Sequence, residues 1–170
     1  EISGRESGKR RMCRRDRYGA RAKREGRGAE YTRQEFLGAG IHGVYAPFID
    51  RDFNAAHRLH VKAWSDEKNA AFFGLCNNPH YHGHNYALIV TVLGEIDPVT
   101  GYVMDIQTLS EAIEKHVLIR LDHKNLNIEV EPFITLNPSA ENIAVTIWQW
   151  LRPVISHELG IKVTLYETPR

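Results

Sequence analysis

Two stretches of the chain alternate apolar side chains with other residues, as β-strands do. One covers residues 53–59, where every second position is apolar or a histidine, and the other begins at residue 81 and continues into the apolar run Tyr86–Leu93. Successive side chains of a strand point to opposite faces of a sheet, so residues two apart share a face. We therefore predict two neighbouring strands here, with folded structure beginning near Val44 and a last strand over residues 161–167.

Between the second and the last strand, apolar residues recur at the spacing of helices. One helix follows Asp105 and another follows Ser139, two residues that can cap a helix. A shorter helix is predicted over residues 65–73, ending at Gly74. Strands paired in sequence, with helices gathered on one face, make an α+β fold in which we expect the strands to run antiparallel.

The composition is that of a soluble globular protein of one domain, with 170 residues of which 42% are hydrophobic and 25% charged. No apolar run approaches the roughly 20 residues of a membrane span, and the amino end lacks the apolar core of a secretory signal. Only Cys13 and Cys76 occur, which is typical of a reduced intracellular compartment and predicts no disulfide framework. We therefore expect a cytoplasmic protein without a membrane partner.

Charge is distributed unevenly along the chain. Residues 1–35 carry 12 Lys and Arg against 6 Asp and Glu, whereas residues 36–170 carry 10 against 15. A basic segment without hydrophobic periodicity is compatible with a nucleic-acid-binding arm or an Arg-rich transit peptide. We interpret it instead as a disordered extension with no part in the chemistry, and we expect no nucleic-acid partner. The predicted organisation is an extension over residues 1–43 and a folded domain over residues 44–170.

The alternation of the second strand also places two histidines on one face. His82 and His84 flank Gly83, and their Cα atoms would lie about 6.5 Å apart at about 3.3 Å per residue, within reach of one metal ion bound at about 2.0–2.1 Å. His57 lies on the preceding strand, and antiparallel pairing would set it opposite this pair. Three neutral imidazoles leave the fourth position of a tetrahedral Zn²⁺ open, as catalytic zinc sites do.

His80 is a rival third ligand because it falls on the same face as His82 and His84. Along an extended strand, about 13 Å would separate it from His84, so the chain would have to bend for both to bind one ion. Two half-exposed strand histidines without a metal remain the alternative interpretation of the His-Gly-His motif alone. Cys76 precedes this strand in a loop, where a reactive thiol has room to approach a ligand.

Seven short motifs follow one another between residues 48 and 168, namely Phe53-Asn-Ala-Ala-His57-Arg-Leu, Cys76-Asn-Asn-Pro, His82-Gly-His84-Asn-Tyr, Asp97-Pro-Val-Thr-Gly101, Leu121-Asp-His-Lys-Asn-Leu126, Ser139-Ala-Glu-Asn142 and Tyr166-Glu-Thr168. With this set the chain resembles the 6-pyruvoyl-tetrahydropterin synthase family. The resemblance implies a tunnelling fold, in which an antiparallel four-stranded sheet carries two helices on one face and the sheets of several subunits close into a barrel. It also implies a homohexamer of two stacked trimers, with active sites where subunits meet.

The reaction that the resemblance implies converts 7,8-dihydroneopterin triphosphate to 6-pyruvoyl-tetrahydropterin, with release of triphosphate, in tetrahydrobiopterin biosynthesis. Zinc would act as a Lewis acid on the side-chain hydroxyls of the substrate, and a thiolate would remove the neighbouring proton. The site residues that the resemblance implies are the zinc ligands His57, His82 and His84, the thiol base Cys76, its relay partners Asp122 and His123, and the pterin anchor Glu167.

The spacing within the motifs bears on which reaction is expected. Five residues separate Cys76 from His82, which favours the pyruvoyl-forming synthases over the related 6-carboxy-tetrahydropterin synthases, which act on the same substrate with a shorter spacing. Two larger residues, His80 and Tyr81, stand before the His-Gly-His motif where the family usually has smaller ones. The carboxy-tetrahydropterin reaction is therefore the alternative activity.

Two further features depart from the resemblance. The chain ends at Arg170, before the closing strand of the family, and residues 1–43 have no family counterpart, so we expect a truncated final strand and keep a non-catalytic zinc-binding assembly module as a third hypothesis. The folded domain is also net acidic, and its field should repel a triphosphate. We therefore expect zinc and a few pocket-facing cations near the subunit junction to bind the triphosphate, with Lys124 and Arg58 as candidates.

Overall fold

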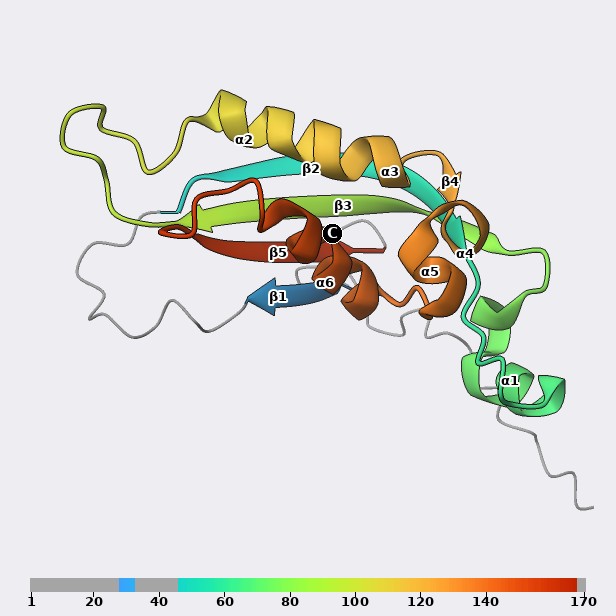
Figure 1. The fold of residues 1–170 in the computed structure, drawn as a ribbon. Helices are drawn as coiled ribbons and strands as arrows, with labels where there is room; N and C mark the ends of the chain where they lie inside the picture. The colour runs from blue at the N-terminus through green and yellow to red at the C-terminus, as the bar shows by residue number, and fades with distance from the viewer. Residues whose placement is uncertain (1–27, 33–45, 168–170) are drawn as a thin grey trace, which may run out of the picture.

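The longest strand of the described structure, β3 (His82–Leu93), lies at the centre of a five-stranded sheet whose order is β1-β5-β3-β2-β4. The computed structural model describes residues 28–32 and 46–167 (Figure 1). The other strands are β1 (Gly28–Thr32), β2 (Phe48–His57), β4 (Lys124–Asn125) and β5 (Gly160–Tyr166). The helical segments are α1 (Asp66–Phe73), η2 (Gly74–Asn77), α2 (Ile106–Ile113), η3 (Glu114–Leu118), α3 (Ile119–Leu121), α4 (Leu126–Glu129), α5 (Glu131–Thr135) and α6 (Ala140–Leu151).

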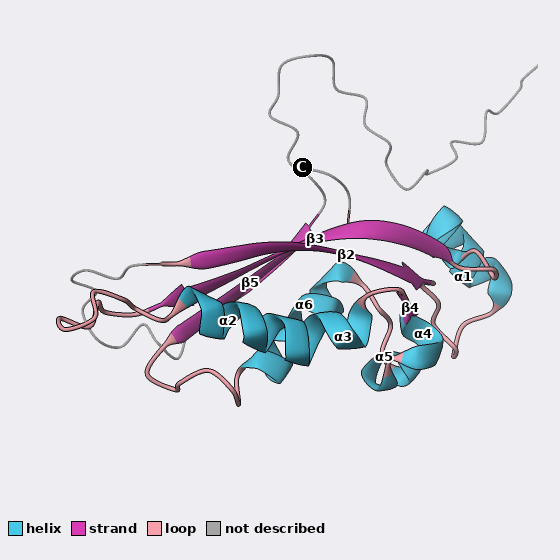
Figure 2. Ribbon diagram, turned by 90° about the horizontal axis from the view of Figure 1, so that it is seen from above, coloured by secondary structure: helices cyan, strands magenta, loops and turns pink. Residues whose placement is uncertain are grey.

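The central strands pair as the sequence predicts. β3 is antiparallel to β2 on one side and to β5 on the other, and helices cover one face of the sheet (Figure 2). The α+β class with helices on one face is therefore confirmed. The prediction of a wholly antiparallel four-stranded sheet is wrong, because β4 runs parallel to β2 and β1 adds a fifth strand.

Both unexpected strands lie at the edges of the sheet. β4 is two residues long, too short to show an alternating pattern, and it follows a turn at His123, whose φ is 57°. β1 lies inside the basic segment and pairs with β5, so it supplies hydrogen bonds to an edge that would otherwise expose backbone N–H and C=O groups. One strand therefore lies before the predicted start of folded structure near Val44. Val44 itself, and residues 1–27 and 33–43, lie outside the described residues.

The helices begin where capping residues predict. Asp105 accepts hydrogen bonds from the backbone N–H groups of Gln107 and Thr108 at the start of α2, and Ser139 accepts one from Asn142 at the start of α6. These bonds satisfy amide groups that have no partner within the first helical turn. The first long helix continues from α2 through the π-helical turn η3 into α3.

The core lies between the sheet and the helices that cover it. Phe53 of β2 stacks on Tyr86 of β3 with ring centroids 4.9 Å apart, and both are buried with Leu109 of α2 and Ile147 of α6. The same face of the sheet, at the end of β2 where this packing stops, carries His57. Among the described residues, no helix combines the length and the apolar character needed to cross a membrane.

Candidate metal centre

The register between β2 and β3 brings three histidines together. His57 lies opposite His82, and Ala55 lies opposite His84, so all three histidine side chains leave the sheet on one face. One ring nitrogen from each of the three residues lies within 4.8 Å of the other two. The strand alternation therefore does produce the predicted cluster, and among the described residues it forms without His80.

Hydrogen bonding fixes the orientation and tautomer of the His57 ring. Its Nδ1 lies 2.7 Å from the backbone oxygen of Pro138, and a carbonyl can only accept a hydrogen bond, so Nδ1 carries the proton. The other nitrogen, Nε2, then presents a lone pair and lies 3.1 Å from Nε2 of His82. A ring N–H held by a backbone carbonyl is the usual support of a metal-ligating histidine.

The surroundings keep the rings of His57 and His82 neutral. The pKa of His57 is lowered to about 4, chiefly by burial; the bond to Pro138 opposes this shift, and the neighbouring His82 and His84 add to it. Burial also lowers the pKa of His82. Neutral imidazole is the form that binds a metal ion, so the cluster presents ligands at neutral pH without first losing protons.

The geometry fits a tetrahedral ion. Two nitrogens bound to one Zn²⁺ at about 2.0–2.1 Å and at tetrahedral angles would lie ~3.3 Å apart, close to the 3.1 Å between Nε2 of His57 and Nε2 of His82. His82 also has a buried nitrogen, Nδ1, without a hydrogen-bond partner among the described residues.

Tyr86 and Glu167 extend the histidine face of the sheet. The ring of Tyr86 lies 5.6 Å from that of His84, centroid to centroid, and its hydroxyl lies 3.4 Å from Nδ1 of His57. Tyr166 pairs with Ala87, so Glu167, the next residue, continues toward Tyr86. Burial and then the charge of Glu167 raise the pKa of Tyr86, which keeps its phenol protonated. The charge of Glu167 thus acts on Tyr86, whose ring borders the histidine cluster.

Cys76 lies in the short helix η2, where its backbone oxygen accepts a hydrogen bond of 2.8 Å from the N–H of Leu59. Leu59 is two residues beyond His57, so the thiol-bearing turn is tied to the chain that leaves the metal cluster. Cys76 is disulfide-bonded in this structure, and one such bond is not the disulfide framework that the sequence argues against.

Asp122 and His123 lie elsewhere, at the edge of the sheet beside β2. The carboxylate of Asp122 accepts a hydrogen bond of 2.8 Å from the N–H of Asn54, the largest cause of its lowered pKa, and contacts Nδ1 of His123 at 2.9 Å. The His123 side chain is 78% exposed and borders an open hollow of about 340 Å³ that also includes Asn54 and Asn85. Its lining also includes His84, so the hollow that His123 borders reaches one of the three clustered histidines.

Comparison with known proteins decides the family. The sequence profile described as 6-pyruvoyl tetrahydropterin synthase matches residues 48–170. The chain belongs to the 6-pyruvoyl tetrahydropterin synthase family. It is 48% identical to the 6-pyruvoyl tetrahydrobiopterin synthase of Homo sapiens over 116 residues, which are 68% of this chain and 80% of that protein. It is also 48% identical to the synthase of Drosophila melanogaster over 119 residues, 69% of this chain and 71% of that protein.

A solved structure agrees with this assignment. The 6-pyruvoyl tetrahydropterin synthase of Caenorhabditis elegans superposes with a TM-score of 0.65 at 34% sequence identity, covering 74% of this chain and 96% of that chain. The predicted membership of the family is therefore confirmed. Against that background, the residues that the motifs did not explain become informative.

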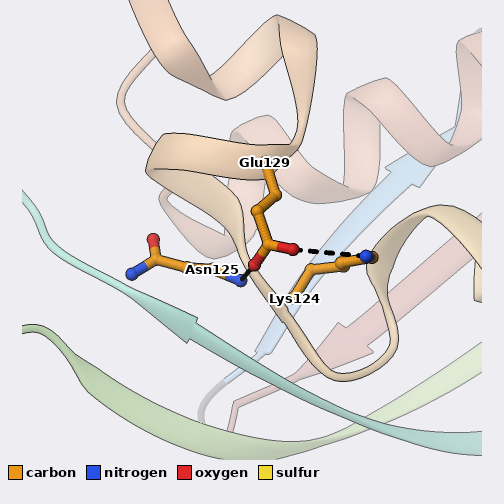
Figure 3. Close-up of polar contacts among 3 residues, drawn as sticks. All are labelled: Lys124, Asn125 and Glu129. Atoms are coloured by element: carbon orange, nitrogen blue, oxygen red, sulfur yellow. Dashed lines mark hydrogen bonds and ion pairs between the residues drawn. The ribbon is translucent and has the colours of Figure 1, made fainter.

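The two cations suggested for the triphosphate are both engaged within the chain. The Nζ of Lys124 lies 3.2 Å from the carboxylate of Glu129, whose other oxygen accepts a 2.7 Å hydrogen bond from the N–H of Asn125 (Figure 3). These contacts, the backbone N–H first, lower the pKa of Glu129. Arg58 directs its guanidinium at Asn77. In this family member, the side chains of Lys124 and Arg58 thus stabilise local structure, whether or not they also bind a ligand.

Sequence reasoning missed the asparagines that hold the segment leaving β2. Asn127 bonds the backbone N–H and C=O of Arg58, Asn77 bonds the C=O of Leu59, and Asn137 bonds the N–H of His60. Asparagine suits this role because its amide carries both a donor and an acceptor. The only signal for Asn77 and Asn127 is their place within the Cys76-Asn-Asn-Pro and Leu121-Asp-His-Lys-Asn-Leu-Asn segments, and Asn137 lies in neither.

Proposed function

We propose that this protein converts 7,8-dihydroneopterin triphosphate to 6-pyruvoyl-tetrahydropterin and triphosphate, a step of tetrahydrobiopterin biosynthesis, in the cytoplasm. The observation that carries the proposal is the cluster of His57, His82 and His84 in a chain 48% identical over 116 residues to proteins named for this activity. Because some relatives carry other names, membership of the family does not by itself define the reaction. The residues of the site and their neighbours have to account for it.

His57, His82 and His84 would hold Zn²⁺, each through one ring nitrogen. Bound there, the ion would supply Lewis acidity toward the hydroxyl oxygens of the substrate side chain. Pro138 supports this role by fixing the His57 tautomer. The neutral state of His57 means that binding displaces few protons at neutral pH.

Glu167 and Cys76 have separate tasks toward the substrate. The carboxylate of Glu167 would accept two hydrogen bonds, from a ring N–H and the amino group of the pterin, and so would orient the substrate on the histidine face. Cys76, once reduced, would remove a proton from the substrate side chain as a thiolate, after which triphosphate departs as the leaving group.

Asp122 and His123 support a site completed by a second copy of the chain. His123 is largely exposed at the β2 edge and lies outside the histidine cluster of its own chain. We therefore assign the dyad to the Cys76 of a neighbouring subunit in a homohexamer of two trimers, with edge strands of adjacent subunits pairing to close a barrel. In such an assembly the Asp122 carboxylate would hold His123 in position to receive the proton.

Mixing two inactive variants tests this arrangement. Cys76→Ala and His123→Ala, each inactive alone, should regain activity when unfolded and refolded together, because about a quarter of the sites in a random mixture would pair an intact thiol with an intact dyad. Refolding each variant alone is the control. If the mixture stays inactive while wild-type protein recovers under the same conditions, the dyad does not act across subunits.

The reaction itself is tested with 7,8-dihydroneopterin triphosphate and the reduced, zinc-loaded protein. Release of inorganic triphosphate is expected, together with a 6-pyruvoyl product that keeps all side-chain carbons. Acetaldehyde in place of that product would indicate the 6-carboxy-tetrahydropterin reaction. A folded, zinc-loaded oligomer that releases no triphosphate would instead be a zinc-binding assembly module.

The variant Cys76→Ala tests whether Cys76 acts as the base or as a zinc ligand. The variant should lose turnover and keep its zinc, because the thiol is assigned to proton transfer. Zinc content measured by atomic absorption decides the point, and a loss of zinc in this variant would place Cys76 among the ligands.

A further inference from the structure

The segment Arg58–His60 connects the metal cluster to the turn that carries Cys76. It leaves β2 directly after His57 and lies in no strand or helix, so its backbone groups must find other partners. Side-chain amides supply most of them, and the N–H of Leu59 bonds the backbone oxygen of Cys76 at 2.8 Å. This hydrogen bond between Leu59 and Cys76 thus joins the turn of the proposed base to the segment that follows the proposed metal ligand His57.

Asn77 is the centre of this connection. It is only 8% exposed, and its Nδ2 donates to the backbone oxygen of Leu59 at 2.7 Å and lies 3.0 Å from Nδ1 of His60. Its Oδ1 accepts from Nη2 of Arg58 at 3.1 Å, and its backbone oxygen accepts from Nε of the same guanidinium at 3.1 Å. Asn77 is therefore held on both its side chain and its backbone by residues one to three positions beyond His57.

The guanidinium of Arg58 is suited to this contact by its shape. Two N–H groups on one rigid plane reach two oxygens of Asn77 at once, which a lysine ammonium on a flexible stem does not reproduce. The backbone of Arg58 is fixed in turn by Asn127, at 2.7 Å to its N–H and 3.0 Å to its C=O. Motion of Cys76 relative to His57 would therefore break several hydrogen bonds at once.

We propose that Asn77, gripped by Arg58, is a positioning residue that sets the location of Cys76 relative to the histidine cluster. The inference rests on the proposed function, in which Cys76 is the base. A proton acceptor works only within hydrogen-bond reach of the proton that it removes, and a displacement of about 1 Å can lower a rate about 10²-fold. The peptide bond between Cys76 and Asn77 transmits the position of one to the other.

Asn69 offers a matched control nearby. It is also buried, its Oδ1 accepts from the N–H of Val61 at 2.8 Å, and its Nδ2 donates to the backbone oxygens of Val61 and Trp64. This asparagine closes the loop before α1 and contacts neither Cys76 nor Arg58 through the hydrogen bonds of the described residues. Asn69→Asp and Asn77→Asp therefore both replace a buried amide donor by an acceptor, but only the second acts on the turn of Cys76.

The test compares these variants in full-length, reduced, zinc-loaded protein that carries Cys13→Ser, so that Cys76 is the one remaining thiol. For Asn77→Asp we expect kcat to fall about 10²-fold, with KM and zinc content changed less than about twofold. Asn69→Asp should keep kcat within about twofold, even where both variants melt at lower temperature. Arg58→Lys, which keeps the charge and loses the planar fork, should also lower kcat with zinc retained, and it serves if Asn77→Asp does not fold.

Alkylation of Cys76 gives a readout that does not depend on turnover. The rate of modification by iodoacetamide, followed by mass spectrometry, should change at least about tenfold in Asn77→Asp and not in Asn69→Asp, because the thiol has moved relative to its surroundings. If the parent protein releases no triphosphate, the proposed function fails while this comparison still decides the positioning role. Unchanged alkylation and unchanged kcat in Asn77→Asp, equal losses in both asparagine variants, or zinc loss in parallel with kcat would each overturn the proposal.

Discussion

His57 should make the metal-free protein sensitive to acid. In the folded chain burial lowers its pKa from 6.5 to about 4, whereas the unfolded chain leaves it at the ordinary value near 6.5. Between these two pH values the unfolded state binds a proton that the folded state does not, so the free energy of unfolding falls as the pH falls through this window. At about 1.4 kcal/mol per pKa unit, the loss attributable to His57 is about 3 kcal/mol by pH 4. Above pH 6.5 the contribution is complete.

Urea unfolding of EDTA-treated protein measures this loss, with His57→Asn as the reference. Asparagine keeps an amide donor that can face the carbonyl of Pro138 and has no proton to gain. Carboxylates titrate in the same range, but they are common to both proteins. We expect the parent to lose about 3 kcal/mol more than the variant between pH 7 and pH 4. Equal losses in the two proteins would show that His57 is not buried as a neutral ring, and the metal-ligand assignment would lose its main support.

Further predictions concern strain, metal and substrate. Tyr81 has a φ of 64°, which costs a non-glycine residue about 1–2 kcal/mol, so Tyr81→Gly should stabilise the protein by about 0.5–1 kcal/mol after the added entropy of glycine and raise Tm by about 2 °C. Gly101, with a φ of 74° and open space around it, should show the opposite, with Gly101→Ala losing about 1 kcal/mol and a rise in Tm contradicting the argument. His82→Ala should lose zinc while keeping the fold, measured by metal content and circular dichroism. Glu167→Gln should raise KM about tenfold or more with zinc retained, because an amide sets a donor against a donor of the pterin.

The parts of this structure that sequence predicts are those with a local pattern. Alternation along residues 53–59 and 81–93 defines two strands, and because the histidines lie within that alternation, their common face follows from the backbone alone. Asp105 and Ser139 mark helix starts through a side-chain hydrogen bond to an amide two or three residues later, which is again a local signal. The shared face of His82 and His84 was therefore predictable from one strand, whereas the addition of His57 to them depends on the pairing of β2 with β3.

What the sequence does not reveal depends on contacts between distant segments. β4 is two residues long and owes its place to β2, and β1 owes its place to an open edge of β5. Asn77 and Asn127 act on a segment 18 to 69 residues away in sequence, so no periodicity marks them.

The three residues after His57 link the strand that carries a proposed zinc ligand to the turn that carries the proposed base. The ligand itself is set by β2, a strand paired along its whole length, and therefore rigid. The proposed base is carried by η2, a turn of four residues that has no such ladder and is held by hydrogen bonds to the segment after His57. A metal site tolerates little displacement of its ligands, and a proton acceptor tolerates little displacement from its substrate. The position of η2 therefore has to be fixed by contacts with the segment that leaves β2. The hydrogen bonds between Arg58–His60 and the Cys76 turn fix that position. Their loss should lower turnover, whereas zinc binding, which depends on the strands, should be preserved.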